Sequence, residues 1–494
     1  MAPGTKLLSQ LGLTARTGGD VAVTGLSLDS RKVATGHLFA ALPGTRVHGG
    51  EFIQYALRMG AGAILTDREG ADIAAAQLAA SDAALVVVQD ARAALAHAAA
   101  LWFGTQPETV VAVTGTNGKT SVASFTRQIW AALGRDAVNI GTTGVEGAFA
   151  APGIHTTPEA LTLHRLLADM SDAGITHAAM EASSHGLDQR RMEAVSLAAA
   201  AFTNLTQDHL DYHGTMESYF QAKLRLFTEL LSEDGVAVVN LDDSYGPRVA
   251  EACATREIEV IGVGQYSADA GLKITGRRLD DTGQDVLFRW QGTQYQTRLD
   301  LIGAFQAMNA LTAAGLVIGA GEQPEAVFGV LRKLDGVRGR MQLAGRRSNG
   351  APVYVDYSHT PDSLETALKA LRPHVLGRLV VVFGAGGDRD RGKRPLMGKA
   401  AAEFADLQIV TDDNPRSEDP ADIRAAILAG CPEATEIADR AEAILRGVDA
   451  LEPGDALLIA GKGHETGQIV GDVVYPFDDV EQASVAVAAL EGRV

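Results

Sequence analysis

Short apolar runs that end in polar, glycine-containing clusters recur along this chain, and they constrain its fold more than any other feature. The runs are rich in β-branched residues and alternate with helical patterns, which is typical of parallel sheets covered by helices on both faces. The pattern predicts strands at 61–66, 83–89, 109–114, 175–182, 197–204, 235–240, 352–356, 379–383, 406–411 and 455–460. It predicts helices at 91–103, 122–133, 160–173, 216–231, 362–372, 394–405 and 439–450. We therefore expect an α/β protein.

The length of 494 residues suggests about three domains. Shifts in the pattern place their boundaries near residues 106 and 336, which gives segments 1–106, 107–336 and 337–494. Within the middle segment, residues 270–303 alternate polar and apolar side chains between Gly and Asp turns. That alternation predicts an antiparallel excursion from an otherwise parallel sheet.

Charge and cysteine content exclude several classes of function. A formal net charge of −18 argues against nucleic acid or an anionic membrane as the main partner. We see no apolar stretch long enough to span a membrane and no secretory signal, so we expect a cytoplasmic protein. Cys253 and Cys431 are far apart and have no metal or redox spacing, which favours two reduced structural cysteines.

The most specific cluster lies between Val110 and Ser121, where an apolar run breaks into a glycine loop before a helix. Backbone N–H groups of this loop can point at phosphate oxygens, Lys119 can neutralise them, and the Thr120 hydroxyl can reach Mg²⁺. The common phosphate-loop spacing requires glycine at position 113, where Val113 stands. The segment is therefore either a chance glycine turn or a tighter form of the loop, and its strand–loop–helix context favours the second.

Polar clusters also follow six other predicted strands, at 181–186, 204–209, 356–362, 384–390, 412–416 and 461–465. Ligands of open α/β sheets bind at the carboxyl ends of the strands. Together with the glycine loop, these clusters predict two active faces, one in each of two α/β domains.

Several residues in these clusters have chemistry that suits a site, although spacing alone leaves alternatives open. Glu181 ends a strand and could ligate Mg²⁺ beside Thr120, or be a solvated glutamate. His209 could equally be a structural polar residue. Lys223 flanks an apolar helix stripe and by spacing is an ordinary surface lysine whose stem packs on that stripe.

The loop at 384–390 lacks the third glycine of a dinucleotide fingerprint, because Arg389 occupies that position. Its many charges of both signs suit a zwitterionic ligand instead. Arg416, in the turn at 413–416, could bind a carboxylate through two hydrogen bonds, or be a surface arginine.

Taken together, the segments Gly115–Thr120, Met180–Arg191 and Phe202–His213 resemble the Mur ligases of bacterial peptidoglycan synthesis. The resemblance extends over essentially the whole chain, and it is strongest to members that add the third residue of the stem peptide. It implies an N-terminal UDP-binding domain (1–106), a central ATP-binding ligase domain (107–336) and a C-terminal Rossmann-like amino-acid-binding domain (337–494). The tight glycine loop with Val113 is also the form found in that family.

The resemblance implies ATP and Mg²⁺ as cofactors, and it assigns roles that spacing left open. The catalytic residues would be Lys119, Glu181, His209 and Lys223. Metal ligands would be Thr120, Glu181, His209 and Lys223, the last modified to a carbamate (N6-carboxylysine). The ATP site would comprise Gly115, Thr116, Asn117, Gly118, Lys119, Thr120, Ser121, Asn309, Arg340, Asp356 and His359. The site for UDP-MurNAc-L-Ala-D-Glu would comprise Ser30, His48, Thr156, Thr157, Ser183, Gln189 and Arg191.

The amino acid implied by the resemblance is meso-diaminopimelate, whose distal carboxylate would pair with Arg416. Its site would comprise Arg389, Asp413, Asn414, Arg416, Gly461 and Glu465. The implied reaction is ATP-driven amide formation through an acyl phosphate, carried out by a monomer; the general base for the amine stays open. Two rivals remain: a ligase of the same fold that uses L-lysine or extends a glutamate chain on folate, and a nucleotide-switched binding protein without ligase activity.

Overall fold

The computed structural model describes residues 4–44, 47–153 and 155–492. The chain divides into two compact units. The first comprises residues up to Leu272 together with Leu311–Val327, and the second comprises Lys273–Ala310 and Phe328–Val494. Helices α11 (Phe305–Gly319) and α12 (Pro324–Val330) contribute residues to both units.

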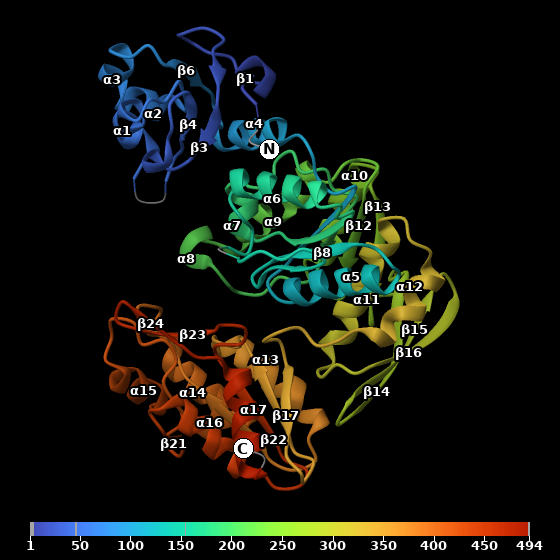
Figure 1. Cartoon of the computed structure of the whole chain (residues 1–494). Helices are drawn as coiled ribbons and strands as arrows, with labels where there is room; N and C mark the ends of the chain where they lie inside the picture. Colours follow the sequence, from blue (N-terminus) through green and yellow to red (C-terminus); the bar gives the residue numbers. More distant parts are fainter. Residues whose placement is uncertain (1–3, 45–46, 154, 493–494) are drawn as a thin grey trace. The chain divides into compact units, whose positions relative to one another are not determined.

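The first unit begins with a small parallel sheet in the order β3-β4-β5-β6 (blue in Figure 1). Its strands are β3 (Gly25–Ser27), β4 (His37–Ala41), β5 (Ala63–Thr66) and β6 (Ala84–Val87). Helix α4 (Ala91–Phe103) packs on one face and α1 (Ile53–Arg58) on the other. Shorter elements complete this part: β1 (Lys6–Leu7), β2 (Ala22–Val23), α2 (Arg68–Ile73) and α3 (Ala75–Ala79).

A larger sheet in the same unit has the strand order β13-β12-β11-β7-β10-β8-β9, and all its pairs are parallel except β8–β9. Its strands are β7 (Thr109–Thr114), β8 (Ala137–Gly141), β9 (Gly144–Gly147), β10 (His177–Glu181), β11 (Ala199–Phe202), β12 (Val236–Asn240) and β13 (Glu259–Gly264). The central strands are continuously apolar because helices cover both faces. Figure 1 shows α5 (Lys119–Ala132) on one side of this sheet and α6 (Ala160–Asp172) on the other. The remaining helices are α7 (Ser184–Asp188), α8 (Leu210–His213), α9 (Met216–Arg225) and α10 (Gly246–Thr255).

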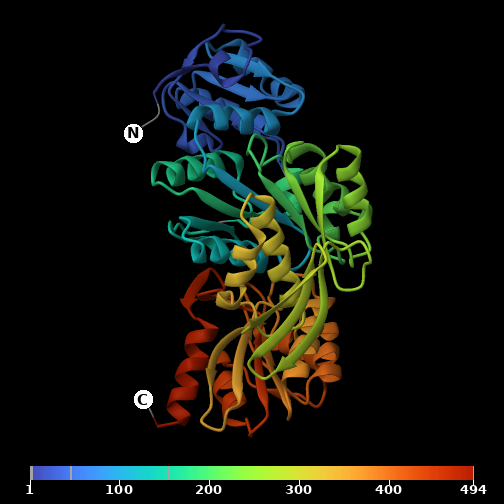
Figure 2. The same cartoon turned by 90° about the vertical axis from the view of Figure 1, so that its right-hand side faces the viewer.

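The second unit contains a six-stranded sheet in the order β17-β18-β22-β19-β20-β21. Its strands are β17 (Gln342–Arg346), β18 (Pro352–Asp356), β19 (Leu379–Phe383), β20 (Leu407–Val410), β21 (Thr435–Glu436) and β22 (Ala456–Ala460), and only β17 is antiparallel to its neighbour. One face packs against α13 (Pro361–Leu371), α14 (Lys393–Phe404) and α15 (Pro420–Leu428). The other packs against α16 (Arg440–Asp449) and α17 (Asp479–Leu490); in Figure 2 the red α17 and the orange helices lie on opposite sides of the sheet.

Two antiparallel ribbons complete the second unit. Strands β14 (Leu272–Asp280), β15 (Gly283–Trp290) and β16 (Thr293–Leu299) form the excursion that the alternating pattern of 270–303 predicts, and β15 pairs with β16 in antiparallel register. The hairpin of β23 (Gly467–Val470) and β24 (Val473–Pro476) follows β22.

The predicted α/β class is confirmed, and all ten predicted strands occur to within about two residues at either end. Strand β7 and helix α4 have the predicted bounds. Sequence patterns missed β8, β9 and β13, the short N-terminal strands, and β17, β21, β23 and β24. Both cysteines are buried and free, in agreement with their predicted structural role. Within the described residues, no helix is long and apolar enough to cross a membrane.

A buried ion pair joins the two helices that cover one face of the second sheet. Both side chains, Arg440 of α16 and Asp479 of α17, are fully inaccessible to solvent. The guanidinium donates from Nε and Nη2 to the two carboxylate oxygens, each at 2.7 Å, and also from Nη2 to the carbonyl of Ala460. A two-point pair of this kind in a dry interior is costly to break, because either charge left alone lacks water.

We expect Asp479→Asn to lower the free energy of unfolding of the second unit by about 3–5 kcal/mol, because it leaves the Arg440 charge uncompensated. Urea titration followed by circular dichroism measures this change. Glu442→Gln is the matched control, since it breaks the exposed Arg446–Glu442 pair on the same helix and should cost at most about 0.5 kcal/mol. Equal effects of the two substitutions on the free energy of unfolding would contradict a stabilising role of the buried Arg440–Asp479 pair.

Candidate active site

The glycine loop between β7 and α5 is folded as the sequence predicts for a phosphate-binding loop. Gly115 has φ +150° and Gly118 has φ +87°, conformations that favour glycine. An added Cβ at Gly115 would lie 1.9 Å from the Thr203 hydroxyl. The Lys119 ammonium donates to the carbonyls of Gly115 (2.9 Å) and Thr116 (2.8 Å), so it lies over the loop.

Residues after the neighbouring strand β11 hold the outer part of the loop. The Asn117 backbone N–H donates to the Asn204 side chain at 2.9 Å, and the Thr203 hydroxyl donates to the Asn117 carbonyl at 2.7 Å. Thr116 lies within hydrogen-bonding distance of the Tyr219 hydroxyl, at 3.2 Å. Residues after β11 and Tyr219 of α9 therefore hold the loop in place.

Glu181, at the carboxyl end of β10, is 1% exposed and lies beside the first turn of α5. Its Oε2 accepts a hydrogen bond from the Thr120 hydroxyl at 3.1 Å, and its Oε1 accepts one from the Thr142 backbone N–H at 2.8 Å. Space for the carboxylate exists because residue 141 is glycine: a Cβ there would lie 1.9 Å from Oε1. A carboxylate and a threonine hydroxyl beside a phosphate loop are oxygen ligands of the kind that Mg²⁺ uses together with phosphate.

Lys223 of α9 is 1% exposed, so it is not the surface lysine that its spacing suggested. Its Nζ donates to the Gly115 carbonyl at 2.7 Å and lies 4.5 Å from the centre of the Tyr219 ring. Burial, and secondarily the Lys119 charge, lower the pKa of Lys223 well below the usual value of a lysine. The helix continues after α9 as a π-helical turn, Leu226–Leu230, a feature often found near functional sites.

His209 lies near this lysine but is much more exposed. Its backbone adopts the left-handed conformation (φ +52°), its side chain is 46% exposed, and its Nε2 is 3.4 Å from the Asp208 carboxylate. Its ring lies 6.2 Å from that of Tyr219 and 4.8 Å from that of His185, centre to centre. Burial, with a smaller contribution from His209, lowers the pKa of His185 to about 4, so that imidazole is neutral near pH 7.

The residues expected to bind the muramoyl dipeptide form one hydrogen-bonded network next to Glu181. The Thr157 hydroxyl donates to the Glu181 carbonyl (2.8 Å) and lies 3.0 Å from the Ser183 hydroxyl. Arg191 donates to the Thr157 carbonyl (2.7 Å) and to the Gln189 side chain (2.8 Å). Thr156 joins the network through Thr142, at 3.1 Å.

Two cavities of the first unit are lined mainly by residues that precede β7. The larger, of about 830 Å³, is lined by Ser30 and by exposed apolar side chains of Phe52, Tyr55 and Met59. His48 lies in sequence between Val47 and Gly49, which both line this cavity. Its Nδ1 accepts a hydrogen bond from the Gly50 backbone N–H, and its Nε2 is 3.1 Å from Asp67.

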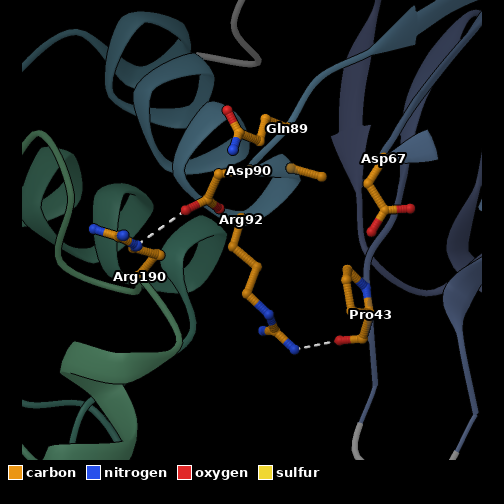
Figure 3. A pocket seen from close by; sticks show the side chains of 7 residues that line it. Pro43, Asp67, Gln89, Asp90, Arg92 and Arg190 are labelled. Atoms are coloured by element: carbon orange, nitrogen blue, oxygen red, sulfur yellow. Dashed lines mark hydrogen bonds and ion pairs between the residues drawn. The ribbon is translucent and has the colours of Figure 1, made fainter. Parts of the chain in front are cut away.

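The smaller cavity, of about 460 Å³, contains two arginines (Figure 3). Arg190 pairs with Asp90 at 3.0 Å, and Arg92 donates to the Pro43 carbonyl. Asp67, the partner of His48, also lines this cavity. Burial, and secondarily the Arg92 charge, lower the pKa of Arg191. The cavity is thus lined both by Asp67, the partner of His48, and by Arg190, the neighbour of Arg191. The family resemblance assigns His48 and Arg191 to the same substrate.

In the second unit, the turn after β20 and the loop after β22 meet in a buried polar cluster. The Asn414 amide nitrogen donates to Glu465 at 2.8 Å, while its oxygen accepts from the Lys462 ammonium (2.8 Å) and from the Ile469 backbone N–H (2.9 Å). Asp413 is 6% exposed. Gly461 has φ +120°, and a Cβ there would lie 2.4 Å from the Asp413 carboxylate.

Arg416 ends this turn in a left-handed conformation (φ +53°). Its Nη1 donates to the Gly387 carbonyl at 2.8 Å, and its backbone N–H donates to the Ile469 carbonyl at 3.1 Å. Arg389 of the charged loop is exposed and donates to the Asp388 carbonyl at 3.0 Å. The Arg416 Nη1 also lies 3.5 Å from the Asn414 carbonyl, so Arg416 adjoins the cluster. The Arg389 side chain instead donates its hydrogen bond within its own loop.

The other predicted nucleotide residues of the second unit lie around Tyr357, with one exception. The Arg340 guanidinium lies 4.8 Å from the centre of the Tyr357 ring, and His359 lies 4.6 Å from it, ring to ring. Asp356 accepts from the backbone N–H groups of Met341 (2.7 Å) and Ser358 (2.9 Å). The exception, Asn309 of α11, hydrogen-bonds to Gln306 at 3.0 Å.

Comparison with known proteins decides the family. Three family models match in order: "Mur ligase family, catalytic domain" over residues 22–103, "Mur ligase middle domain" over 113–317, and "Mur ligase, glutamate ligase domain" over 339–463. This chain belongs to the Mur ligase family. It is an ATP-dependent, amide-forming ligase.

Individual members of the Mur ligase family match over nearly the whole chain. The UDP-N-acetylmuramoyl-L-alanyl-D-glutamate–2,6-diaminopimelate ligase of Caulobacter vibrioides is 51% identical, covering 96% of each chain. The ligase of the same name from Bradyrhizobium diazoefficiens is 50% identical, covering 94% of this chain and 95% of its own. A solved structure of a ligase with that name superposes with a TM-score of 0.73 at 34% identity and covers 99% of both chains. A folylpolyglutamate synthase of Mycobacterium tuberculosis complexed with ADP shares the fold, with a TM-score of 0.62 at 19% identity.

The oxygen donors of this Mur ligase fit a magnesium–nucleotide complex better than a metal site made of side chains alone. In the described part of the chain, no three His, Cys, Asp or Glu side chains are grouped so that they could hold a metal ion. Glu181 and Thr120 instead supply two oxygen ligands next to a loop for phosphate, and Mg²⁺ usually keeps its other positions for phosphate and water.

Sequence reasoning missed several residues that complete these sites. Asn204 and Thr203 belong to a recognised motif, yet nothing in their spacing shows that they hold Asn117. Lys462 follows a predicted strand, but its complete burial has no sequence signal. Arg92 opens a helix and would ordinarily be read as a surface residue.

We expect Gly141→Ala to weaken Mg²⁺-dependent nucleotide binding roughly 10- to 100-fold, because the new Cβ would displace the Glu181 carboxylate from Thr120. Isothermal titration with a non-hydrolysable ATP analogue, with and without Mg²⁺, measures the effect. Gly329→Ala is the control, since a Cβ at that helical position meets nothing within 4 Å. Unchanged magnesium dependence in Gly141→Ala would contradict a metal role for Glu181.

Proposed function

We propose that this Mur ligase joins meso-2,6-diaminopimelate to the D-glutamyl carboxylate of UDP-N-acetylmuramoyl-L-alanyl-D-glutamate, using ATP. The observation that carries the proposal is the buried cluster of Asp413, Asn414 and Glu465 next to Arg416. Two carboxylates, with a guanidinium in the same turn whose Nη1 lies 3.5 Å from the Asn414 carbonyl, suit a ligand end that bears both an ammonium and a carboxylate. Relatives about 50% identical over nearly the whole chain bear the name of this activity.

The glycine loop binds the ATP phosphates in this proposal, through Gly115, Thr116, Asn117, Gly118, Lys119, Thr120 and Ser121. Lys119 leaves the loop carbonyls to neutralise the phosphate that is transferred. Thr120 and Glu181 hold Mg²⁺, which supplies electrostatic stabilisation of the phosphate charge. Asn309, Arg340, Asp356 and His359 of the second unit bind the rest of the nucleotide.

The reaction proceeds in two steps. The D-glutamyl carboxylate attacks the γ-phosphate of ATP, which releases ADP and gives an acyl phosphate. The amine of diaminopimelate then attacks the acyl carbon, inorganic phosphate leaves, and the amine loses a proton. No side chain of the protein has to form a covalent bond with the substrate.

Lys223 is proposed to work as a carbamate, which would be a further metal ligand beside His209. Carbamate formation joins a neutral amine to CO₂ and releases one proton, so it requires an unprotonated lysine. Burial and the low pKa of Lys223 support this form. Modification converts the buried amine, next to Lys119, into an anion whose charge Mg²⁺ and the Lys119 ammonium can balance.

The nucleotide sugar is proposed to bind across the first unit. Ser30 and His48 contact the uridine diphosphate, while Thr156, Thr157, Ser183, Gln189 and Arg191 hold the muramoyl dipeptide. The cavity of Figure 3, lined by Asp67 and Arg190 among others, offers Arg92 to an anionic part of the ligand. The proposal assigns residues 1–106 to UDP, 107–336 to ATP and 337–494 to the amino acid.

Diaminopimelate is proposed to bind through Arg389, Asp413, Asn414, Arg416, Gly461 and Glu465. The enzyme would act in the cytoplasm as a monomer, with small-molecule substrates and no nucleic-acid or membrane partner. The second function considered, a folate or lysine ligase of the same fold, has no comparable support in this cluster.

Phosphate release with the muramoyl dipeptide and each amino acid in turn tests the proposal. We expect turnover with meso-diaminopimelate and little with L-lysine or glutamate. Arg416→Ala should raise the apparent KM for diaminopimelate roughly 10- to 100-fold, because the distal carboxylate loses a charged partner. Arg446→Ala, at an exposed arginine of α16, is the control. Equal turnover with lysine, or phosphate release that ignores every acceptor, would overturn the proposal.

We expect Lys223→Ala to abolish turnover and added formate or acetate to restore part of it, because a free carboxylate can occupy the place of the carbamate. The matched control is Lys399→Ala, which removes an exposed lysine and should respond to neither change. Intact-mass analysis of the active wild-type protein, run under CO₂-saturated and CO₂-depleted buffer, detects the modification directly. Full activity without CO₂ and no rescue of the variant would exclude the carbamate.

A further inference from the structure

We infer that Lys462 is a specificity-determining residue for the amino acid: its buried charge makes the acceptor site electrically neutral, so that a zwitterionic ligand end is preferred over a lone ammonium. This inference rests on the proposed function and deepens it. Lys462 lies in the loop after β22 and is fully buried.

The contacts of Lys462 place it among the acidic groups of the cluster. Its Nζ lies 2.8 Å from the Asn414 amide oxygen, 3.4 Å from Glu465 Oε2 and 3.9 Å from Asp413 Oδ1. Glu465 is the more exposed of the two carboxylates, with 32% of its side chain accessible. An ammonium thus already lies among the carboxylates that would attract the ammonium of a ligand.

The orientation of the Asn414 amide follows from its neighbours. Both the Lys462 ammonium and the Ile469 backbone N–H can only donate, so the amide oxygen must face them. The amide nitrogen then faces Glu465 Oε2, at 2.8 Å. Lys462 and Asn414 both contact the same carboxylate oxygen, which fixes the glutamate while leaving its negative charge only partly balanced.

The formal charges of six side chains in the cluster and its buried support add to zero; Arg389 is not counted among them, because it is exposed and donates to the Asp388 carbonyl. Asp413, Glu465 and Asp479 are acidic, and Lys462, Arg440 and Arg416 are basic. The Arg440–Asp479 pair is fully buried, and Arg440 also donates to the carbonyl at the end of β22. In such a poorly solvated setting, an added net charge has little water to stabilise it.

The two candidate amino acids differ in the charge that they bring to this cluster. The distal end of diaminopimelate carries one ammonium and one carboxylate and leaves the total at zero. The distal end of lysine carries an ammonium only and raises the total by one. Discrimination therefore includes a penalty against the wrong ligand in addition to the attraction between Arg416 and the correct one.

Loss of the Lys462 charge should weaken the preference for diaminopimelate over lysine. We expect Lys462→Met, in the full-length enzyme, to lower the ratio of kcat/KM for meso-diaminopimelate to kcat/KM for L-lysine by about tenfold or more. The KM for diaminopimelate should rise, and the KM values for ATP and the muramoyl dipeptide should stay within about twofold, because the change is confined to the charge of the acceptor site. Lys462→Arg keeps the charge and should retain most of the ratio; Lys399→Met, at an exposed lysine, is the surface control.

A second variant tests charge separately from packing. Asn414→Asp also lowers the net charge of the cluster by one while leaving Lys462 in place, so it should shift the acceptor ratio in the same direction even if Lys462→Met folds poorly. Inhibition of the diaminopimelate reaction by L-lysine gives an independent readout, and it should strengthen in both variants.

The outcomes separate this inference from the function on which it rests. A wild-type enzyme that ignores diaminopimelate contradicts the proposed function. A wild-type enzyme that uses diaminopimelate, together with folded variants whose acceptor ratio is unchanged, overturns the role of Lys462 alone. Equal loss of activity with both amino acids in Lys462→Met and Asn414→Asp would also overturn it, because that result indicates a structural lysine.

Discussion

The carboxyl ends of parallel strands determine where most chemical groups of interest in this protein are found. A strand buried on both faces is uniformly apolar, so polar residues can appear only where it ends. The ends of parallel neighbours lie at one edge of a sheet, which brings together residues that are far apart in the chain. Thr114, Glu181 and Phe202 end β7, β10 and β11, three adjacent strands. The second unit repeats this arrangement with β18, β22, β19 and β20.

Buried charges at these strand ends are tolerated because each is satisfied by named partners. Glu181 has Thr120 and Thr142, Lys223 has the Gly115 carbonyl, and Lys462 has Asn414. Glycines provide the room: at 115 and 141 a side chain would overlap the polar groups themselves. The sites therefore depend as much on missing Cβ atoms as on the functional side chains.

How much of this could be predicted from the sequence differs between fold and site. The strands were predictable because β-branched runs and glycine-rich ends carry a local signal. The position of the glycine loop followed from its own residues, and family resemblance added the expected substrates. Burial was not predictable, because it depends on residues distant in sequence: Lys223 looked like a surface lysine, and Lys462 had no assigned role. Strands β8 and β9 were missed since their short, mixed sequence has no clear period.

Lys119 closes the glycine loop on itself, in addition to the contacts that Asn204 and Thr203 make with it. Its ammonium donates to two carbonyls of the same loop, those of Gly115 and Thr116. A phosphate must compete with these internal bonds, so part of its attraction is offset and the loop has little ordering left to do. The affinity that Lys119 adds for a nucleotide is therefore the difference between its bonds to phosphate and its bonds to the loop carbonyls, which limits how tightly this side chain can hold the nucleotide.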